Sequence, residues 1–474
     1  MNKSLAVEPT TPGNDSSTAF DAALIAKHQR AGPRYTSYPT ADRFVDDFDL
    51  EALRRRLVAR EGNASAGPWS IYVHLPFCAS VCYYCGCNRI VSANTSRATD
   101  YVNYLEREIA LHGKQLGEER SVRQMHWGGG TPTFVPYSDM ARLMACLRGE
   151  FDFLPRAELA IEIDPRTVDA DGVHRLARLG FNRVSLGVQD FDHDVQVAVN
   201  RVQSEAQTLA VLQAARDTGF RSINVDLIYG LPRQTSAGFE RTLDKVIRAN
   251  PDRIALYSYA HLPELFKMQR QIDPAGLPAA ETKLEILGLA IDRLTQAGYL
   301  YIGIDHFARP DDELAVALRE SRLQRNFQGY STNRDCDLLA FGISAIGAVG
   351  TSYYQNHREL AGYYAAIDGG SLPIARGIEL APDDLLRKAV IQALMCRFVV
   401  DIAAIEADHG IVFDRYFEDE LTELEAFAAG GLATVGKESI TVTPTGRFLV
   451  RNVCMVFDRY LREAKTRARY SKSI

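Results

Sequence analysis

The sequence between residues 70 and 257 alternates short apolar runs with longer amphipathic runs, and this alternation limits the possible folds. Apolar runs of four to seven residues between helical runs of ten or more are typical of βαβ units, which build a parallel sheet. Six such strands in succession predict an α/β chain with a partial, TIM-like (β/α)6 barrel. The expected strands are 70–75, 124–127, 158–163, 183–188, 222–228 and 253–257, and the expected helices are 97–115, 138–149, 170–179, 205–218 and 237–249.

Polar residues and glycines cluster where the predicted strands end. The carboxyl ends of barrel strands carry the active site in folds of this kind, so we expect these distant residues to meet at one mouth. Glycines let a backbone approach a ligand closely, although a plain tight turn also explains them. A buried acid needs a partner, which is either a ligand or an arginine of the protein itself. The candidates are Tyr72, Gly129, Gly130, Glu162, Gln189, Asp226 and Ala260.

Four of the eight cysteines lie within ten residues, directly after the first predicted strand. They are Cys78, Cys82, Cys85 and Cys87. The chain starts without an apolar signal-peptide core, so we expect a cytoplasmic protein, in which clustered thiols hold metal or perform chemistry. Structural zinc sites usually pair two C-x2-C halves, and this sequence has no second half. The C-x3-C-x2-C spacing favours three corners of a [4Fe-4S] cubane, whose fourth iron stays open to a non-protein ligand.

The same spacing resembles the signature of the radical SAM superfamily. That resemblance implies that the open iron binds S-adenosylmethionine (SAM). It also implies that an electron from the cluster cleaves SAM into methionine and a 5′-deoxyadenosyl radical, which abstracts a hydrogen atom. Tyr84 matches the aromatic position of the motif that packs near the adenine.

Longer stretches resemble the family of oxygen-independent coproporphyrinogen III oxidases, from about residue 25 to the C-terminus. The alternative is a heme chaperone on the same barrel, since heme-trafficking relatives resemble this chain there. Those relatives usually have Phe where Cys87 stands and typically lack the arm that contains residues 34–40. Both features favour the oxidase. The stretches are 32–40, 74–78, 126–133, 187–191, 226–232, 306–312 and 326–330.

The resemblance to this family also implies roles for individual residues. Cys78, Cys82 and Cys85 match the cluster ligands, and Cys87 matches a required cysteine that is not a ligand. Two SAM molecules are implied, and the division of residues between them is an expectation. The cluster-bound SAM would meet Tyr72, Gly129, Thr131, Glu162 and Arg201, and the second would meet Gly130, Gln189, Asp226, Ala260 and Ile346.

The reaction implied by the resemblance is the oxidative decarboxylation of two propionates of coproporphyrinogen III to vinyl groups, which gives protoporphyrinogen IX. The expected partners are a flavodoxin- or ferredoxin-like electron donor and an electron acceptor that the sequence does not identify. The substrate has four carboxylates, so we expect arginines at the barrel mouth and take Arg34 and Arg309 as candidates. We expect a monomer.

Charge and hydropathy exclude two other classes of partner. The net charge of −6 offers no basic field for nucleic acid. The longest uncharged apolar run, 338–350, is shorter than the roughly 20 residues that a membrane helix needs.

We divide the chain into an N-terminal arm (1–52), the partial barrel (53–355) and a C-terminal domain (356–474). Residues 1–17 are rich in Thr, Ser, Pro and Gly and are expected to be mobile. The C-terminal pattern resembles a winged helix, but residues 401–425 are acidic, so we expect a lid over the substrate rather than a DNA-binding domain. The expected elements there are a helix over 383–398, a helix within 413–429, a helix over 445–461 and strands 432–435 and 439–443.

Overall fold

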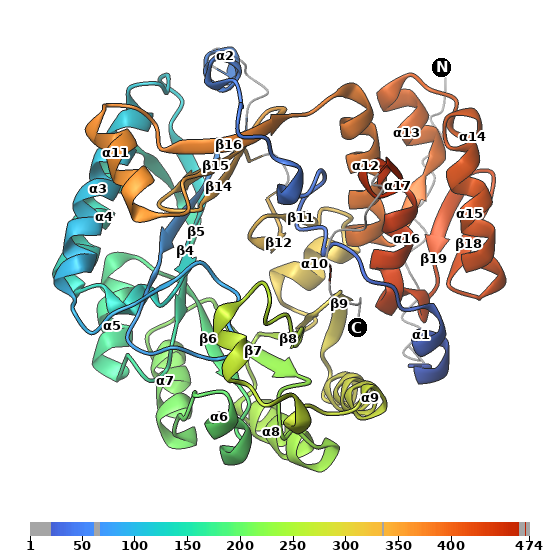
Figure 1. Cartoon of the computed structure of the whole chain (residues 1–474), viewed down its shortest axis with the longest axis horizontal. Helices are drawn as coiled ribbons and strands as arrows, with labels where there is room; N and C mark the ends of the chain where they lie inside the picture. The colour runs from blue at the N-terminus through green and yellow to red at the C-terminus, as the bar shows by residue number, and fades with distance from the viewer. Residues whose placement is uncertain (1–19, 61–66, 334–335, 464–469, 471–474) are drawn as a thin grey trace, which may run out of the picture.

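The structure is a computed structural model that describes residues 20–60, 67–333, 336–463 and residue 470 (Figure 1). The expected mobility of residues 1–17 concerns a segment outside this part of the chain. One 12-stranded sheet runs through the molecule in the order β16-β15-β14-β13-β1-β4-β5-β6-β7-β8-β10-β9. Helices cover its outer side, and the C-terminal helices gather at one flank (Figure 1).

Six neighbouring strands in the middle of this sheet are parallel, which confirms the predicted partial barrel. Their side chains alternate between two faces, as a strand requires. In β7, for example, Val225 and Leu227 are buried, whereas Asn224 and Asp226 are only partly buried and occupy the other face. The parallel strands are β1 (Trp69–Leu75), β4 (Ser121–Gly129), β5 (Asp152–Ile163), β6 (Arg183–Gln189), β7 (Ser222–Tyr229) and β8 (Arg253–Ser258).

The helices that connect these strands begin and end at residues with clear local signals. In α5, the Asp169 side chain accepts a hydrogen bond from the backbone N–H of Gly172, which caps the first turn. The same helix ends at Gly180, whose φ of +101° suits a residue without a Cβ. The helices around the barrel are α3 (Ser96–Gly113), α4 (Tyr137–Glu150), α5 (Ala170–Leu179), α6 (His193–Ala198), α7 (Glu205–Asp217), α8 (Ser236–Ala249) and α9 (Ala280–Gln296).

The sheet extends beyond both edges of the predicted barrel. On one side β13 (Leu338–Phe341) pairs in parallel with β1 and continues antiparallel through β14 (Ile346–Val349), β15 (Ser352–Asn356) and β16 (Ile374–Glu379). The apolar run 338–350 therefore forms β13 and β14. On the other side β10 (His306–Ala308) and β9 (Leu300–Gly303) run antiparallel. No helix of the described residues is long and apolar enough to cross a membrane.

A short hairpin, β11 (Gln324–Asn326) and β12 (Gly329–Ser331), lies between the barrel and the C-terminal helices (Figure 1). We call residues 324–331 the inner hairpin. Its carbonyl at Arg325 accepts a hydrogen bond from Nε2 of Gln392, 2.8 Å away on the first C-terminal helix. The hairpin thereby links the two parts of the molecule.

The N-terminal arm runs between the barrel and the C-terminal region (Figure 1). Its Tyr35 hydroxyl donates a hydrogen bond to Asp458 across 2.9 Å. Its Val45 forms an antiparallel β-bridge with Gly377 of β16. Both anchors lie far away in sequence, so the arm holds the two parts together. It contains α1 (Ala22–His28) and ends in the first turn of α2 (Leu50–Arg60).

The C-terminal helices and strands follow the predicted order with three corrections. The helix expected within 413–429 is present over Glu418–Ala429, but an unpredicted helix covers Ile402–His409, and the helix expected over 445–461 is interrupted at Phe457 and Asp458. The Asp458 carboxylate accepts from the backbone N–H of Tyr460, which starts a new short helix. The expected strand pair gains a third strand, β17. The elements are α12 (Pro382–Arg397), β17 (Val399–Asp401), α13 (Ile402–His409), α14 (Phe413–Tyr416), α15 (Glu418–Ala429), β18 (Ala433–Val435), β19 (Ser439–Val442), α16 (Val450–Val456) and α17 (Arg459–Glu463).

The domain boundaries drawn from the sequence remain predictions. One feature of the sheet bears on them: β16 lies beyond residue 355 and still belongs to the central sheet.

Candidate active site

The cysteine loop follows β1 and the short strand β2 (Phe77–Cys78), at the carboxyl end of the barrel. Its thiols lie close enough to interact electrostatically. Negative charge on Cys82 or Cys85 raises the pKa of Cys78. Burial raises that pKa to about 11, and the Thr131 hydroxyl lies 3.5 Å from the Cys78 sulfur. A hydrogen bond with Cys87 lowers the pKa of the Cys85 thiol, and the same contact raises the pKa of Cys87. The thiols of Cys85 and Cys87 are therefore in direct contact.

Two guanidinium groups approach the Cys82 sulfur. Nη1 of Arg201 lies 3.4 Å from it and Nη2 of Arg166 lies 3.7 Å from it. Both arginines also bind Asp164, with Nη1 of Arg201 2.9 Å from Oδ2. These donors favour the thiolate that a metal centre needs. The sequence predicts Arg201 in the site, but Arg166, three residues after the end of β5, was not among the candidates.

The loop backbone is fixed on both sides. Nη1 of Arg89 donates to the carbonyls of Cys85 and Cys87, at 2.9 and 3.3 Å. Nδ2 of Asn200 donates to the carbonyl of Val81 across 2.7 Å. The loop is thus held independently of any bound group.

The donor set fits an iron–sulfur cluster. Within the described residues, no three His, Cys, Asp or Glu side chains are arranged around a single metal ion. Ligands of a four-iron cluster bind different irons and do not need to meet at one point. Three adjacent thiols with cationic donors therefore suit the cluster.

Glu162, at the end of β5, accepts two hydrogen bonds. Nε2 of His126 lies 2.9 Å from Oε1, and the backbone N–H of Gly129 lies 3.2 Å from Oε2. Burial alone would raise the pKa of Glu162, but the contact with His126 keeps it below its ordinary value. The carboxylate therefore has an internal partner and still presents 43% of its side-chain surface.

Tyr72 is fixed by a relay of hydrogen bonds. Its hydroxyl lies 3.1 Å from Nδ1 of His74, whose Nε2 lies 2.9 Å from the carbonyl of Asn88. A carbonyl only accepts, so Nε2 carries the proton and Nδ1 accepts from the Tyr72 hydroxyl. Burial lowers the pKa of His74, which agrees with a neutral ring. The Tyr72 ring stacks on His126, with centroids 5.9 Å apart and planes at 14°.

The glycines after β4 are needed by the protein's own packing. Gly129 has a φ of +116°, and a Cβ there would lie 2.7 Å from the His74 ring. A Cβ at Gly130 would lie 2.6 Å from the carbonyl of Pro76. The backbone N–H of Thr131 donates to the carbonyl of Phe77 across 2.8 Å. Close packing of this turn against the cysteine loop accounts for both glycines, without excluding a ligand contact.

Asp226 on β7 is held by Ser185 and Asn224. Their Oγ and Nδ2 atoms lie 2.9 and 2.7 Å from its carboxylate oxygens. Burial, together with the charge of Glu162, raises the pKa of Asp226 to about 6. Nearby, Gln189 has a φ of +67°, and its buried Oε1 has no hydrogen-bond partner in the described chain. Such a buried acceptor is suited to a ligand donor.

Tyr84 and Ala260 are joined by one side chain. Nε2 of Gln269 donates to the carbonyl of Tyr84 at 3.0 Å and to that of Ala260 at 3.2 Å. The contact ties the cysteine loop to the segment after β8.

A cavity of about 350 Å³ brings several predicted residues together. Tyr72, Cys87, Gly129, Glu162 and Ile346 line it. Ala260 lines a different hollow of about 390 Å³. Other residues that line the 350 Å³ cavity were not among the sequence candidates. The following ones belong to the arm, the inner hairpin and β4. They are Thr36, Ala41, Phe327, Gln328 and His126.

The two candidate arginines lie at opposite ends of β8. Nη2 of Arg34 donates to the carbonyl of Ser258, the last residue of β8, across 3.1 Å. Arg309 follows β10, which runs antiparallel and pairs its end with Arg253, the first residue of β8. Nη1 of Arg309 binds Asn250 at 2.6 Å. The expectation for Arg309 is therefore wrong, because the antiparallel return carries it away from the mouth.

Two family models match this chain. The Radical SAM superfamily matches residues 72–246, and the HemN C-terminal domain matches residues 380–449.

Curated relatives match almost the whole chain. The oxygen-independent coproporphyrinogen III oxidase of Salmonella typhimurium is 50% identical over 455 residues, which cover 96% of this chain and 98% of the relative. The protein of the same name from Helicobacter pylori is 41% identical over 444 residues, covering 94% and 97%. Among solved structures, coproporphyrinogen III oxidase (HemN) from Escherichia coli, described as a radical SAM enzyme, has a TM-score of 0.89 and 47% identity. It covers 93% of this chain and 99% of that chain.

Proposed function

This chain belongs to the family of oxygen-independent coproporphyrinogen III oxidases in the radical SAM superfamily, and from that premise we propose how its own residues act. The enzyme oxidises coproporphyrinogen III without oxygen. The observation that carries the assignment of residues is the cavity shared by Tyr72, Cys87 and Glu162 beside the cysteine loop.

Cys78, Cys82 and Cys85 would hold the [4Fe-4S] cluster, with SAM at the open iron. When bound, these groups supply reductive cleavage of SAM and thereby a radical that abstracts hydrogen. The residues nearby are already oriented: Arg201 and Arg166 stabilise negative charge at Cys82. We assign Cys87, whose thiol contacts that of Cys85, as the required cysteine that is not a ligand.

We propose two SAM sites at the same mouth. For the cluster-bound SAM we assign Tyr72, Gly129, Thr131, Glu162 and Arg201. Glu162, held by His126, would accept hydrogen bonds from the ligand. For the second SAM we assign Gly130, Gln189, Asp226, Ala260 and Ile346, with the unpartnered Oε1 of Gln189 as an acceptor.

Each propionate loses one hydrogen atom, one carbon dioxide and one electron. Loss of one β-hydrogen atom leaves a carbon radical on the side chain. The bond to the carboxylate then breaks, carbon dioxide leaves, the vinyl group forms and one electron passes to an acceptor. Two propionates react, which gives protoporphyrinogen IX. Thr36 of the arm and Phe327 of the inner hairpin help to close the cavity, and this exclusion of water protects the radical.

We also propose a flavodoxin- or ferredoxin-like electron donor, an electron acceptor of undefined type, a monomeric state and a location in the cytoplasm. The identity of 41–50% with oxidases, over nearly the full length, does not favour the heme-chaperone alternative.

The test is anaerobic turnover by reconstituted protein, with SAM, coproporphyrinogen III, reductant and cell extract. We expect 5′-deoxyadenosine and vinyl product to rise together and both to vanish in Cys78→Ser. Vinyl product without 5′-deoxyadenosine would overturn the radical mechanism. 5′-Deoxyadenosine without vinyl product would overturn the substrate.

A further inference from the structure

Charged side chains from four distant segments meet near the carboxyl end of β8. Nη1 of Arg34 lies 4.0 Å from Oδ2 of Asp305, in the β9–β10 connection. Arg34, Arg325 and Asp305 all act on the pKa of Arg451, which places the four groups in one neighbourhood. Three of them are cationic and one is anionic.

Arg325 of the inner hairpin is the unusual member of this group. Only 6% of its surface is exposed. Its Nε and Nη1 atoms form no hydrogen bond within the described chain, and no described carboxylate lies within ion-pair distance of it. The guanidinium carbon lies 4.8 Å from the centre of the Tyr330 ring. A buried guanidinium without an anionic partner is costly, so this position is suited to an incoming anion.

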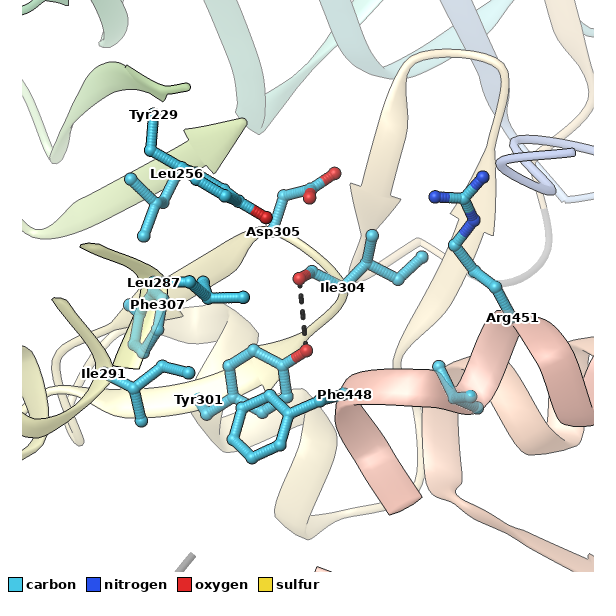
Figure 2. A pocket seen from close by; sticks show the side chains of 11 residues that line it. Tyr229, Leu256, Leu287, Ile291, Tyr301, Ile304, Asp305, Phe307, Phe448 and Arg451 are labelled. Atoms are coloured by element: carbon cyan, nitrogen blue, oxygen red, sulfur yellow. Dashed lines mark hydrogen bonds between the residues drawn. The ribbon is translucent and has the colours of Figure 1, made fainter. Parts of the chain in front are cut away.

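Arg451 on α16 supports the same neighbourhood from the other side. Its Nε and Nη2 donate to the carbonyls of Pro33 and Gly32, at 3.0 and 2.6 Å, and so fix the arm. Figure 2 shows the Arg451 guanidinium and the Asp305 carboxylate on the same side of a small apolar pocket, away from the Phe448 ring. Burial is the main cause that lowers the pKa of Arg451 to about 10, and the positive charge of Arg34 is the second. An anion bound here would offset this mutual repulsion.

His306 supplies a second unpartnered polar atom. Its ring meets Tyr257 and Tyr330 edge-on, with centroids 6.1 and 5.3 Å apart. Its Nδ1 is buried without a hydrogen-bond partner in the described residues. Burial is the main cause that lowers the pKa of His306 to about 3, and the positive charge of Arg325 is the second. The ring is therefore neutral and has one N–H to donate.

The inner hairpin connects this group to the 350 Å³ cavity. Arg325 precedes Phe327 by two residues, and Phe327 and Gln328 line the cavity with Tyr72 and Glu162. Two residues of extended chain span roughly 7 Å. A large ligand in the cavity can therefore reach the arginines with an acidic arm.

We propose that Arg325, supported by Arg451 and His306, binds a carboxylate of a substrate propionate and sets the orientation of the tetrapyrrole. The proposal rests on the proposed function, which supplies a substrate with four carboxylates. The planar fork of a guanidinium matches a carboxylate through two parallel hydrogen bonds. Anchoring one propionate would bring another to the reacting end of the cavity.

The test compares Arg325→Met, Arg325→Lys and the control Arg309→Met, all reconstituted anaerobically. Binding is measured by fluorescence with coproporphyrin III, the stable oxidised form of the substrate, and with its tetramethyl ester, which lacks the charges. We expect Arg325→Met to bind the acid about 10- to 100-fold more weakly, with the ester unchanged. Arg325→Lys should recover part of this affinity, and Arg309→Met should match the wild type. In turnover, KM for coproporphyrinogen III should rise more than kcat falls.

Two failures are distinguishable. If the wild type binds and converts the substrate and both Arg325 variants do the same with unchanged KM, the role of Arg325 is overturned and the proposed function stands. If the wild type neither binds coproporphyrin III nor forms vinyl product, the proposed function fails and this assignment falls with it. Loss of SAM binding in Arg325→Met would show misfolding. In that case porphyrin binding and KM of Arg325→Lys decide whether Arg325 binds the carboxylate.

Discussion

Nε2 of His126 lies 2.9 Å from Oε1 of Glu162, and this contact joins two neighbouring parallel strands at the barrel mouth. The His126 ring also stacks on Tyr72. One histidine therefore orients both the carboxylate and the aromatic ring that we assign to the cluster-bound SAM.

The first prediction concerns this histidine. His126→Ala removes the donor that keeps the pKa of Glu162 low, so the affinity for SAM should fall about tenfold. Equilibrium binding of SAM to reconstituted protein measures the effect. His174→Ala, an exposed histidine on α5, is the matched control and should bind normally. Equal affinity in both variants would remove the proposed role of the His126–Glu162 contact.

The second prediction separates the cysteines. Cys82→Ser should lose the cluster, because a ligand is missing, whereas Cys87→Ser should keep about four irons per chain and still lose activity. Iron and sulfide analysis with turnover measures both properties. Cys146→Ser on α4 should keep cluster and activity. Loss of iron in Cys87→Ser would make Cys87 a ligand and contradict our assignment.

The third prediction concerns pH. The pKa of Asp226 is raised to about 6, so its carboxylate is mostly charged above that pH and mostly protonated below it. If it binds the second SAM, affinity at that site should be full above pH 7 and should decline as pH falls through 6. Asp226→Asn should bind weakly at every pH with a flat profile. Calorimetric titration from pH 5 to 8 measures this, and a wild-type profile as flat as that of Asp226→Asn would refute it.

The fourth prediction concerns the arm. Tyr35→Phe leaves the buried Asp458 carboxylate without one donor, which should cost about 1–3 kcal/mol of unfolding free energy. Tyr416→Phe removes an exposed hydroxyl that donates to Asp383 and should cost less than about 1 kcal/mol. Denaturant titration of both variants gives the comparison. Equal losses would mean that the Tyr35 contact does not hold the arm.

The parallel barrel and most of the site could be predicted because their signals are local. Strands and helices of the barrel are long enough to show their period, and Glu162 and Asp226 stand out in apolar runs. The inner hairpin has strands of three residues each, too short for a period, so the position of Phe327 and Arg325 was not predictable. Arg309 was misplaced because its antiparallel strand depends on long-range pairing, which no local pattern encodes.

The central claim is that hydrogen passes from a propionate β-carbon to the 5′-deoxyadenosyl radical. Coproporphyrinogen III deuterated at the propionate β-carbons tests this directly, with mass spectrometry of 5′-deoxyadenosine during anaerobic turnover. We predict one deuterium transferred for each vinyl group formed. Vinyl product accompanied only by unlabelled 5′-deoxyadenosine would contradict the account.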